Sequence, residues 1–211
     1  MSEQAVAQAV ALLSPDSGEE LERAELYGLL ARCWFAPPDA ALLAQFAVAV
    51  TEAPQPGAFL EAPWQALVAA MRASCVQAAG DEYEALFMGL GKADIFLYGS
   101  HHLAGALNEK PLVALRRDLD ALGLAREPMV METEDHIACL FEVMRYLIAG
   151  DDLAVCNLEQ QRRLFRAHVQ PWIGALCDAV ERHTKASLYA ALAAFTRAFI
   201  EVETQAFDML E

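Results

Sequence analysis

The sequence is short of basic residues. Its 211 residues include 15 lysines and arginines against 30 aspartates and glutamates, which gives a formal net charge of −15 at pH 7. A nucleic-acid partner would require a basic surface against its phosphates, so this balance argues against nucleic-acid binding. An acidic surface suits a cationic partner, and it is equally common as a means of keeping a protein soluble.

The chain also lacks paired cysteines and common catalytic motifs. No H-E-x-x-H, P-loop, G-x-G-x-x-G after a strand or G-x-S-x-G is present. The cysteines form no C-x-x-C pair, a pattern typical of reduced thiols in a cytosolic protein rather than of disulfides or a zinc site. An enzyme is therefore the weaker class of function. The five cysteines are Cys33, Cys75, Cys139, Cys156 and Cys177.

No segment has the pattern of a targeting or membrane-spanning sequence. Glu3 precedes a short apolar run at residues 5–13, and no basic region comes before it, which argues against a signal peptide. The apolar stretch at residues 188–200 is interrupted by Arg197 and is too short to span a bilayer. We therefore expect a cytoplasmic protein without stable membrane insertion.

The composition favours helix over strand. Hydrophobic residues make up 56% of the chain, alanine and leucine dominate, and β-branched residues are sparse. No alternating strand pattern of useful length appears, so we predict an all-α protein. Helices are expected from a capping box at 17–20 to a stop at Pro37-Pro38, from Asp39 to Val50, and at about 63–79, 82–88, 112–122, 132–150, 152–168, 171–184 and 187–209.

Two segments lack a helical period. Residues 89–105 contain four glycines and are expected to form a loop, and residues 125–131 are expected to be a linker. A further break is expected at the proline- and glycine-containing residues 54–57. We predict a single domain over residues 1–211, with an N-terminal lobe at about 18–123, a hinge around 124–131 and a C-terminal lobe at about 132–209.

The stretch ETEDHIACLFEVM, residues 132–144, places carboxylates and a histidine at the expected start of an apolar helix. On a helix, Asp135 and Glu142 share one face and His136 lies at its edge. Thr133 is a candidate N-cap, and acids near a helix start are favoured by the helix dipole. That structural interpretation does not account for Glu142, which lies two turns deeper.

Three further blocks combine aromatic, histidine and turn residues. Each also has a purely structural interpretation. An apolar helical stripe is usually core, neighbouring histidines seldom point the same way as a metal site would need, and tryptophan is more often buried than exposed. The blocks are Tyr83-Glu-Ala-Leu86-Phe87-Met-Gly89, Tyr98-Gly99-Ser100-His101-His102 and Phe165-Arg-Ala-His168-Val-Gln-Pro171-Trp172.

Numbered along the chain, the four blocks begin at Tyr83, Tyr98, Glu132 and Phe165. In this order they resemble the TorD/DmsD/NarJ family of redox-enzyme maturation chaperones. The resemblance covers about residues 20–207, and the family pattern is Y-x-x-L-F, a P-[YW]-x-S loop, E-P-x-D-H-I running into a helix, and a late H-x-x-P-W. Two prolines of that pattern are Leu97 and Thr133 here. Their loss leaves both turns less rigid and puts in doubt an assignment of client specificity from the better-known members.

The resemblance implies a single-domain, TorD-like helical bundle with no catalysis and no cofactor or metal of its own. Members bind the apo catalytic subunit of a molybdenum oxidoreductase, commonly through its twin-arginine signal peptide. They assist insertion of the molybdopterin cofactor and assembly before export. Long helices joined by linkers also allow a helix-swapped homodimer, as the resemblance implies.

The residues agree with this expectation. A receptor for paired arginines followed by an apolar segment needs carboxylates beside an apolar groove. We expect Asp135 and Glu142 to accept guanidinium hydrogen bonds, with His136 beside them. The predicted client-binding set is Tyr83, Leu86, Phe87, Tyr98, Ser100, Asp135, His136 and Glu142.

Two alternatives stay open. The client could be a non-exported formate dehydrogenase or nitrate reductase subunit, in which case the groove would bind a segment without twin arginines. The chain could instead be a metal-dependent hydrolase that uses His101, His102, Asp135, His136 and Glu142.

Overall fold

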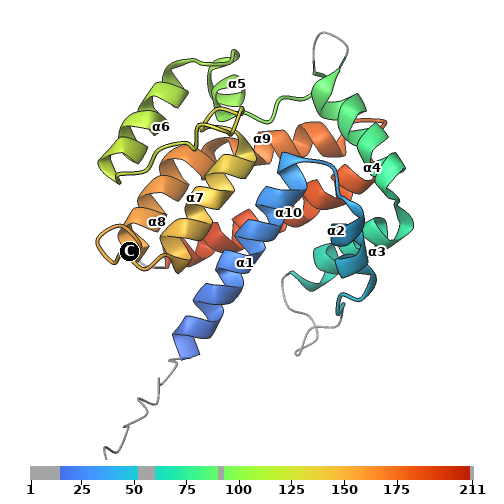
Figure 1. Ribbon diagram of the computed structural model, residues 1–211, viewed down its shortest axis with the longest axis horizontal. Coiled ribbons are helices and arrows are strands. Elements are labelled where there is room, and N and C mark those ends of the chain that lie inside the picture. The colour runs from blue at the N-terminus through green and yellow to red at the C-terminus, as the bar shows by residue number, and fades with distance from the viewer. Residues whose placement is uncertain (1–14, 52–59, 90–92, 210–211) are drawn as a thin grey trace, which may run out of the picture.

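The structure, a computed structural model, describes residues 15–51, 60–89 and 93–209 and is built from helices (Figure 1). Within these ranges, extended pairing is limited to an isolated antiparallel bridge between Tyr98 and His136. The all-α prediction is confirmed. In chain order the helices are α1 (Pro15–Phe35), α2 (Ala40–Ala47), α3 (Glu61–Ala73), α4 (Val76–Tyr83), η1 (Glu84–Met88), α5 (Gly99–Ala104), α6 (Lys110–Ala121), α7 (Ile137–Ala149), α8 (Leu158–Leu164), η2 (Phe165–Val169), α9 (Gln170–Glu181) and α10 (Leu188–Asp208).

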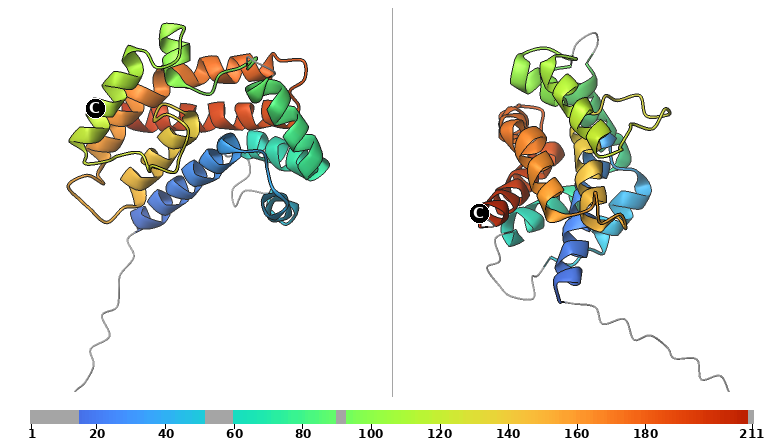
Figure 2. Two further views of the ribbon diagram at one scale, coloured as in Figure 1. Left: turned by 45° about the horizontal axis from the view of Figure 1, so that its top comes forward. Right: turned by 90° about the vertical axis from the view of Figure 1, so that its left-hand side faces the viewer.

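Helices α1 and α10 organise the molecule. Helix α1 packs along α7, α10 packs along α9 and α3, and the left view of Figure 2 shows α9, α10 and α1 as successive layers. Tyr27 of α1 joins them, because its buried ring contacts Phe141 of α7 and Phe199 of α10 at centroid distances of 5.6 and 4.8 Å. Helices from both predicted lobes thus share one core, and the division into lobes stays a prediction. None of the helices in the described ranges is long and apolar enough to cross a bilayer.

Local signals in the sequence set several helix ends. Helix α1 ends at Phe35, two residues before the first proline of Pro37-Pro38, as expected from the missing N–H groups of proline. Asp39 caps α2 by accepting a hydrogen bond of 2.7 Å from Leu42 N. Gly123 follows α6 with a φ of +69°, a conformation that favours glycine.

Other predicted boundaries are wrong. Helix α1 begins at Pro15, so Ser17 lies inside its first turn rather than at the N-cap. The helix expected at 63–79 is two helices, because Ser74 and Cys75 are extended and interrupt it. The loop expected at 54–57 lies outside the described residues.

Two more boundaries depend on polar side chains. The helix expected from 152 starts only at Leu158, because Asp152 accepts a hydrogen bond from Ala154 N in a turn and Asn157 caps α8. The helices on either side of Pro171 are continuous rather than separate. A wide π turn, η2, joins α8 to α9.

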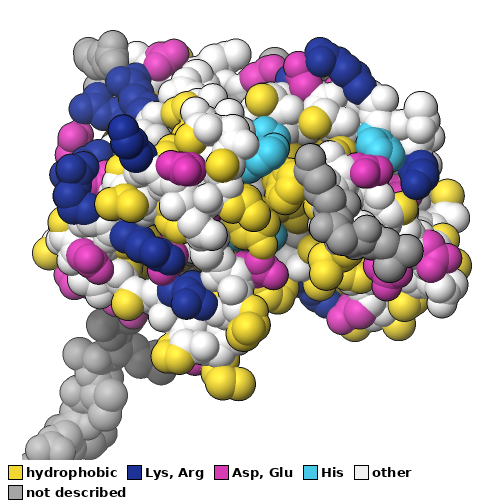
Figure 3. Space-filling view, turned by 90° about the horizontal axis from the view of Figure 1, so that it is seen from above, with side chains coloured by type: hydrophobic (Ala, Val, Ile, Leu, Met, Phe, Trp, Pro, Cys, Tyr) yellow, Lys and Arg dark blue, Asp and Glu magenta, His cyan; other side chains and the backbone are white. Residues whose placement is uncertain are grey.

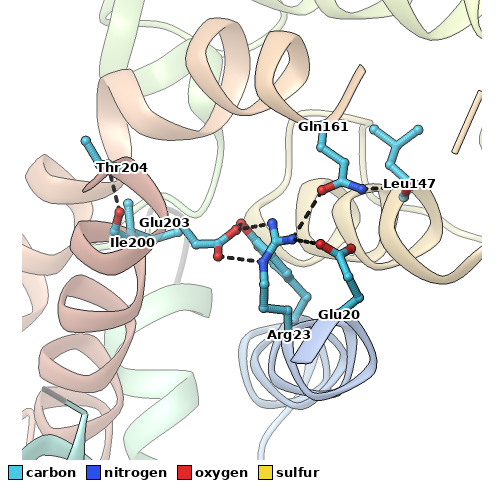
Figure 4. A network of polar contacts seen from close by, with 8 residues as sticks. Glu20, Arg23, Leu147, Gln161, Ile200, Glu203 and Thr204 are labelled. Atoms are coloured by element: carbon cyan, nitrogen blue, oxygen red, sulfur yellow. Dashed lines mark hydrogen bonds and ion pairs between the residues drawn. The ribbon is translucent and has the colours of Figure 1, made fainter. Parts of the chain in front are cut away.

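A buried polar network ties α1 to α10 and α8 (Figure 4). The guanidinium of Arg23 donates two hydrogen bonds of 2.8 Å to the carboxylate of Glu203, which is 1% exposed. Tyr27 OH donates to the same carboxylate at 2.9 Å. Arg23 also contacts Glu20 and the side-chain oxygen of Gln161. The network gives the buried acid a full set of partners.

Candidate functional site

The second and third motif blocks meet at the bridge between Tyr98 and His136. Two backbone hydrogen bonds of 2.9 Å flank the bridge. The Tyr98 ring meets the imidazole edge-on at a centroid distance of 5.1 Å, and its hydroxyl donates to the carboxylate of Glu132. These contacts hold residues 97–100 against the start of α7.

Asp135 lies before α7 rather than on it, because the helix begins at Ile137. One carboxylate oxygen accepts a hydrogen bond of 2.8 Å from Ser100 N, and the other accepts one of 2.6 Å from the hydroxyl of Thr133. The prediction that Asp135 and Glu142 share one helical face is therefore wrong. The prediction that Thr133 caps the helix is also wrong, because its hydroxyl binds Asp135. Asp135 is buried, and both of its oxygens already have partners within the chain.

His136 is the N-cap of α7. Its Nδ1 accepts a hydrogen bond of 3.2 Å from Ala138 N, so the proton of the neutral ring is on Nε2. Burial lowers the pKa of His136 to about 4, although the charges of Glu132 and Asp135 oppose the shift. The ring is therefore neutral near pH 7, and it serves the helix start.

The fourth block lies beneath α5 and α6. The indole N–H of Trp172 donates to His168 O at 2.7 Å, and the ring of His102 stacks on the indole at 5.3 Å. His168 Nε2 lies 2.9 Å from a carboxylate oxygen of Asp118 on α6. Gly99 approaches the indole so closely that a Cβ there would lie 3.1 Å from Trp172 Nε1. The block fastens α9 to α5 and α6.

The first block belongs to the core. Tyr83 OH donates to Phe35 O at 3.0 Å, which fixes the end of α1. Leu86 and Phe87 are 0% and 7% exposed, and Phe87 packs edge-on against Trp34. Leu86 and Phe87 do not line a surface groove here, and their assignment to client binding stays a prediction.

An apolar groove of about 370 Å³ lies between α1, α7 and the segment at 124–131. This volume is within the usual range for binding sites. Three carboxylates and two arginines border it, namely Glu127, Glu134, Glu142, Arg32 and Arg126. Its apolar walls are formed by Ala31, Phe35, Leu119, Leu124, Ala125, Val130, Ala138 and Val143, with Cys139 among them.

Carboxylates outnumber arginines by three to two in the lining of the groove. Burial, together with the charges of Glu132 and Glu134, raises the pKa of Cys139 to about 11. Glu142 is half-exposed and pairs at 2.8 Å with the equally exposed Arg145 from the next turn. Such a surface pair contributes little, so an incoming cation can replace Arg145.

Basic side chains also gather on α6, and one of them, Arg116, reaches Glu134 of the groove. On the face seen in Figure 3, lysine and arginine side chains gather on the left, where Figure 1 places α6, and hydrophobic side chains gather near histidines at the centre. Helix α6 carries Lys110, Arg116 and Arg117. Among these surfaces, the groove is the one that combines apolar walls with an excess of carboxylates.

Sequence reasoning found one residue of this groove and missed its walls. Glu142 was predicted and lines it, whereas Phe35 and Val143 were not singled out. A signal was available for Val143, because Ala138, Cys139, Glu142 and Val143 are spaced on one face of α7. No local signal identifies Phe35, whose place beside α7 depends on packing between distant helices.

The comparisons with known proteins agree with this architecture. A family model described as nitrate reductase delta subunit matches residues 54–178, more than half of the chain. The chain belongs to the nitrate reductase delta subunit family. The predicted TorD/NarJ resemblance is thus confirmed.

Two curated relatives of this family member are the chaperone proteins TorD of two Vibrio cholerae serotype O1 strains, 395 Classical Ogawa and M66-2. Each is 28% identical over 112 residues, which are 50% of this chain and 51% of the relative. The match thus spans about half the length of these relatives. A crystal structure of an Archaeoglobus fulgidus protein assigned as a redox enzyme maturation protein has a TM-score of 0.51 at 19% identity, covering 94% of this chain and 99% of its own. That likeness shows the fold alone.

The residues named for the hydrolase alternative are separately engaged. His101 lies against Phe96 at a centroid distance of 4.2 Å, and His102 stacks on Trp172. Asp135 is hydrogen-bonded within the chain. Across the residues that the structure describes, no three His, Cys, Asp or Glu side chains are grouped to hold a metal ion.

Proposed function

We propose that this family member is a cytoplasmic maturation chaperone, not an enzyme, that binds the apo catalytic subunit of a molybdenum oxidoreductase. In this proposal it holds the twin-arginine signal peptide or N-terminal segment of the subunit and assists molybdopterin cofactor insertion and assembly before export. Family membership supports the class of function. The observation that carries the proposal is the apolar groove between α1 and α7 with carboxylates on its border.

The groove fits the chemistry of such a segment. Its apolar walls can cover the hydrophobic part of the peptide, and Glu142 and Glu127 can accept hydrogen bonds from guanidinium groups. The net charge of −15 would speed the encounter with a cationic segment and make binding weaker at high salt.

The eight predicted residues divide by position. Glu142 lines the groove, while Asp135, His136, Tyr98 and Ser100 join the two chain segments at the start of α7. We infer that these four act on binding by holding α7 and Glu134 in place. Tyr83, Leu86 and Phe87 would support the end of α1 in the same way.

The test measures binding of a fluorescent peptide that carries two adjacent arginines followed by about ten leucine and alanine residues. Glu142→Gln should weaken binding about three- to tenfold, because one charge-assisted contact is lost. Glu159→Gln is the matched control, since Glu159 also pairs with an arginine three residues on, but lies on α8 away from the groove.

A second pair of variants tests the apolar wall. Val143→Ser should weaken binding about threefold or more, because less apolar area is removed from water. Val113→Ser changes an exposed valine of α6 outside the groove and should have no effect. Equal affinities for the groove variants and their controls would overturn the assignment.

A second client class is favoured by the description of the family, which names nitrate reductase. The groove would then bind an N-terminal or internal segment that lacks twin arginines, on a nitrate reductase or formate dehydrogenase subunit that is not exported. Replacing both arginines of the peptide by glutamine separates the two. Retained affinity would support this client, and lost affinity the exported one. Pull-down followed by mass spectrometry would identify the client, and light scattering of the purified chaperone would show whether it forms a homodimer.

A further inference from the structure

We propose that Arg126 competes with the client for the groove. Its guanidinium stays beside the Glu134 carboxylate until a cation of the client displaces it. This inference rests on the proposed function, because it concerns how the same groove selects its occupant. It assigns a specificity role to a residue of the segment at 124–131.

The two oxygens of the Glu134 carboxylate are held unequally. Arg116 donates to Oε2 through Nε at 2.9 Å and approaches it through Nη2 at 2.8 Å. Nε of Arg126 lies 3.7 Å from Oε1, which is beyond hydrogen-bond distance. The Glu134 side chain is only 15% exposed, and its carboxylate also accepts a hydrogen bond from its own backbone N–H, so water replaces a lost cation poorly here. Arg116 is therefore a firm partner and Arg126 an exchangeable one.

Arg126 also controls the wall of the groove. Its guanidinium donates to the backbone oxygen of Val130, and both residues line the groove. The contact folds the segment between them onto itself beside Glu134. Displacing Arg126 would thus free both the carboxylate and the segment that covers the site.

This arrangement favours cationic occupants. An apolar segment that moves Arg126 away leaves an oxygen of Glu134 without a cation, in a largely buried position. A segment with its own guanidinium replaces the loose contact by a charge-assisted hydrogen bond. Arg126 therefore makes the free energy of binding less favourable for segments without a cation.

The chain contains a matched control for the test. Arg32 lines the same groove and carries the same charge, but it pairs at 3.1 Å with Asp39 and not with a groove carboxylate. Arg126→Gln and Arg32→Gln therefore change the net charge of the groove equally. Only Arg126→Gln removes a cation from beside Glu134, where Arg116 stays in place.

The experiment measures the affinity of the twin-arginine peptide for wild type, for both variants, and for each variant combined with Glu134→Gln. Unfolding midpoints close to that of wild type show that every variant is folded. Arg126→Gln should tighten binding about two- to fivefold, the range of an exchangeable surface ion pair. Arg32→Gln should do so less, and the gain should vanish in the Glu134→Gln background. Equal gains for Arg126→Gln and Arg32→Gln, or a gain that survives Glu134→Gln, would show a general charge effect and overturn the competitor while leaving the groove intact. A wild-type protein that does not bind the peptide would overturn the proposed function itself.

Discussion

Replacing Arg23 by alanine should remove the only cation that contacts the Glu203 carboxylate among the residues the structure describes. The Glu203 side chain is 2% exposed and accepts two hydrogen bonds of 2.8 Å from the guanidinium. Tyr27 OH would remain as a neutral donor. The acid would then be buried with one neutral hydrogen bond and no opposite charge.

Removing one partner of a buried ion pair costs about 3–5 kcal/mol. Arg23 is 23% exposed, so water can enter part of the space that it leaves and solvate the acid. We therefore expect the free energy of unfolding to fall by about 3 kcal/mol, the lower end of that range. This is a large fraction of the stability of an ordinary domain.

The assay is urea unfolding followed by far-ultraviolet circular dichroism. Arg162→Ala is the control, because Arg162 pairs at 3.0 Å with Glu159 on the surface and should cost less than about 1 kcal/mol. Replacing Arg23 by methionine, Glu203 by leucine and Tyr27 by phenylalanine together should cost far less than Arg23→Ala, since neither a buried charge nor a buried hydroxyl without an acceptor is left. If Arg23→Ala cost no more than Arg162→Ala, the inference that this network stabilises the packing of α1 on α10 would be refuted.

Three further stability predictions follow from single contacts, each measured by the same unfolding assay. Gly99→Ala should lower the free energy of unfolding by about 1–3 kcal/mol, because the new Cβ would lie 3.1 Å from Trp172. The indole is buried and hydrogen-bonded and cannot move aside, so an unchanged free energy would refute this prediction. Because burial lowers the pKa of His136 from 6.5 to about 4, the unfolded state binds more protons between these values, and stability should fall by up to about 3 kcal/mol as the pH drops through that window. His136→Asn keeps a capping oxygen and should remove this part of the pH dependence, so an unchanged pH slope would contradict the assignment. Glu82→Ala should cost about 1–2 kcal/mol, because its carboxylate accepts hydrogen bonds from three N–H groups at the start of α10, and Glu84→Ala on the exposed side of η1 is the control.

Much of the fold was predictable because local signals determine it. The stop at Pro37-Pro38, the cap at Asp39 and the left-handed Gly123 each act within a few residues of the helix end that they define. The apolar period of residues 188–208 likewise marks α10. These features depend on neighbours in the chain, and a single sequence contains them.

The remaining features depend on partners that lie far away in the chain. Helix α5 forms inside an expected loop because the Asp135 carboxylate binds Ser100 N, 35 residues earlier. Helix α10 starts against Glu82, more than 100 residues before it. The sequence predicts a ligand contact at Asp135, but it does not show the partner Ser100, which lies 35 residues away. A local motif indicates that a polar side chain has a role, but a hydrogen-bond partner that is distant in the sequence is known only from the folded structure.

The positions of the four motif blocks suggest how recognition and framework are divided. Residues that the family pattern specifies hold the framework of the groove: Tyr83 fixes the end of α1, and the contacts of Asp135 and His136 hold the start of α7. The end of α1 and the first turns of α7 both line the groove. Residues that line it, such as Glu134, Glu142 and Val143, occupy positions that the family pattern does not specify. We therefore expect exchange of lining residues to change client preference while stability is kept, and changes in the motif blocks to lower stability and binding together.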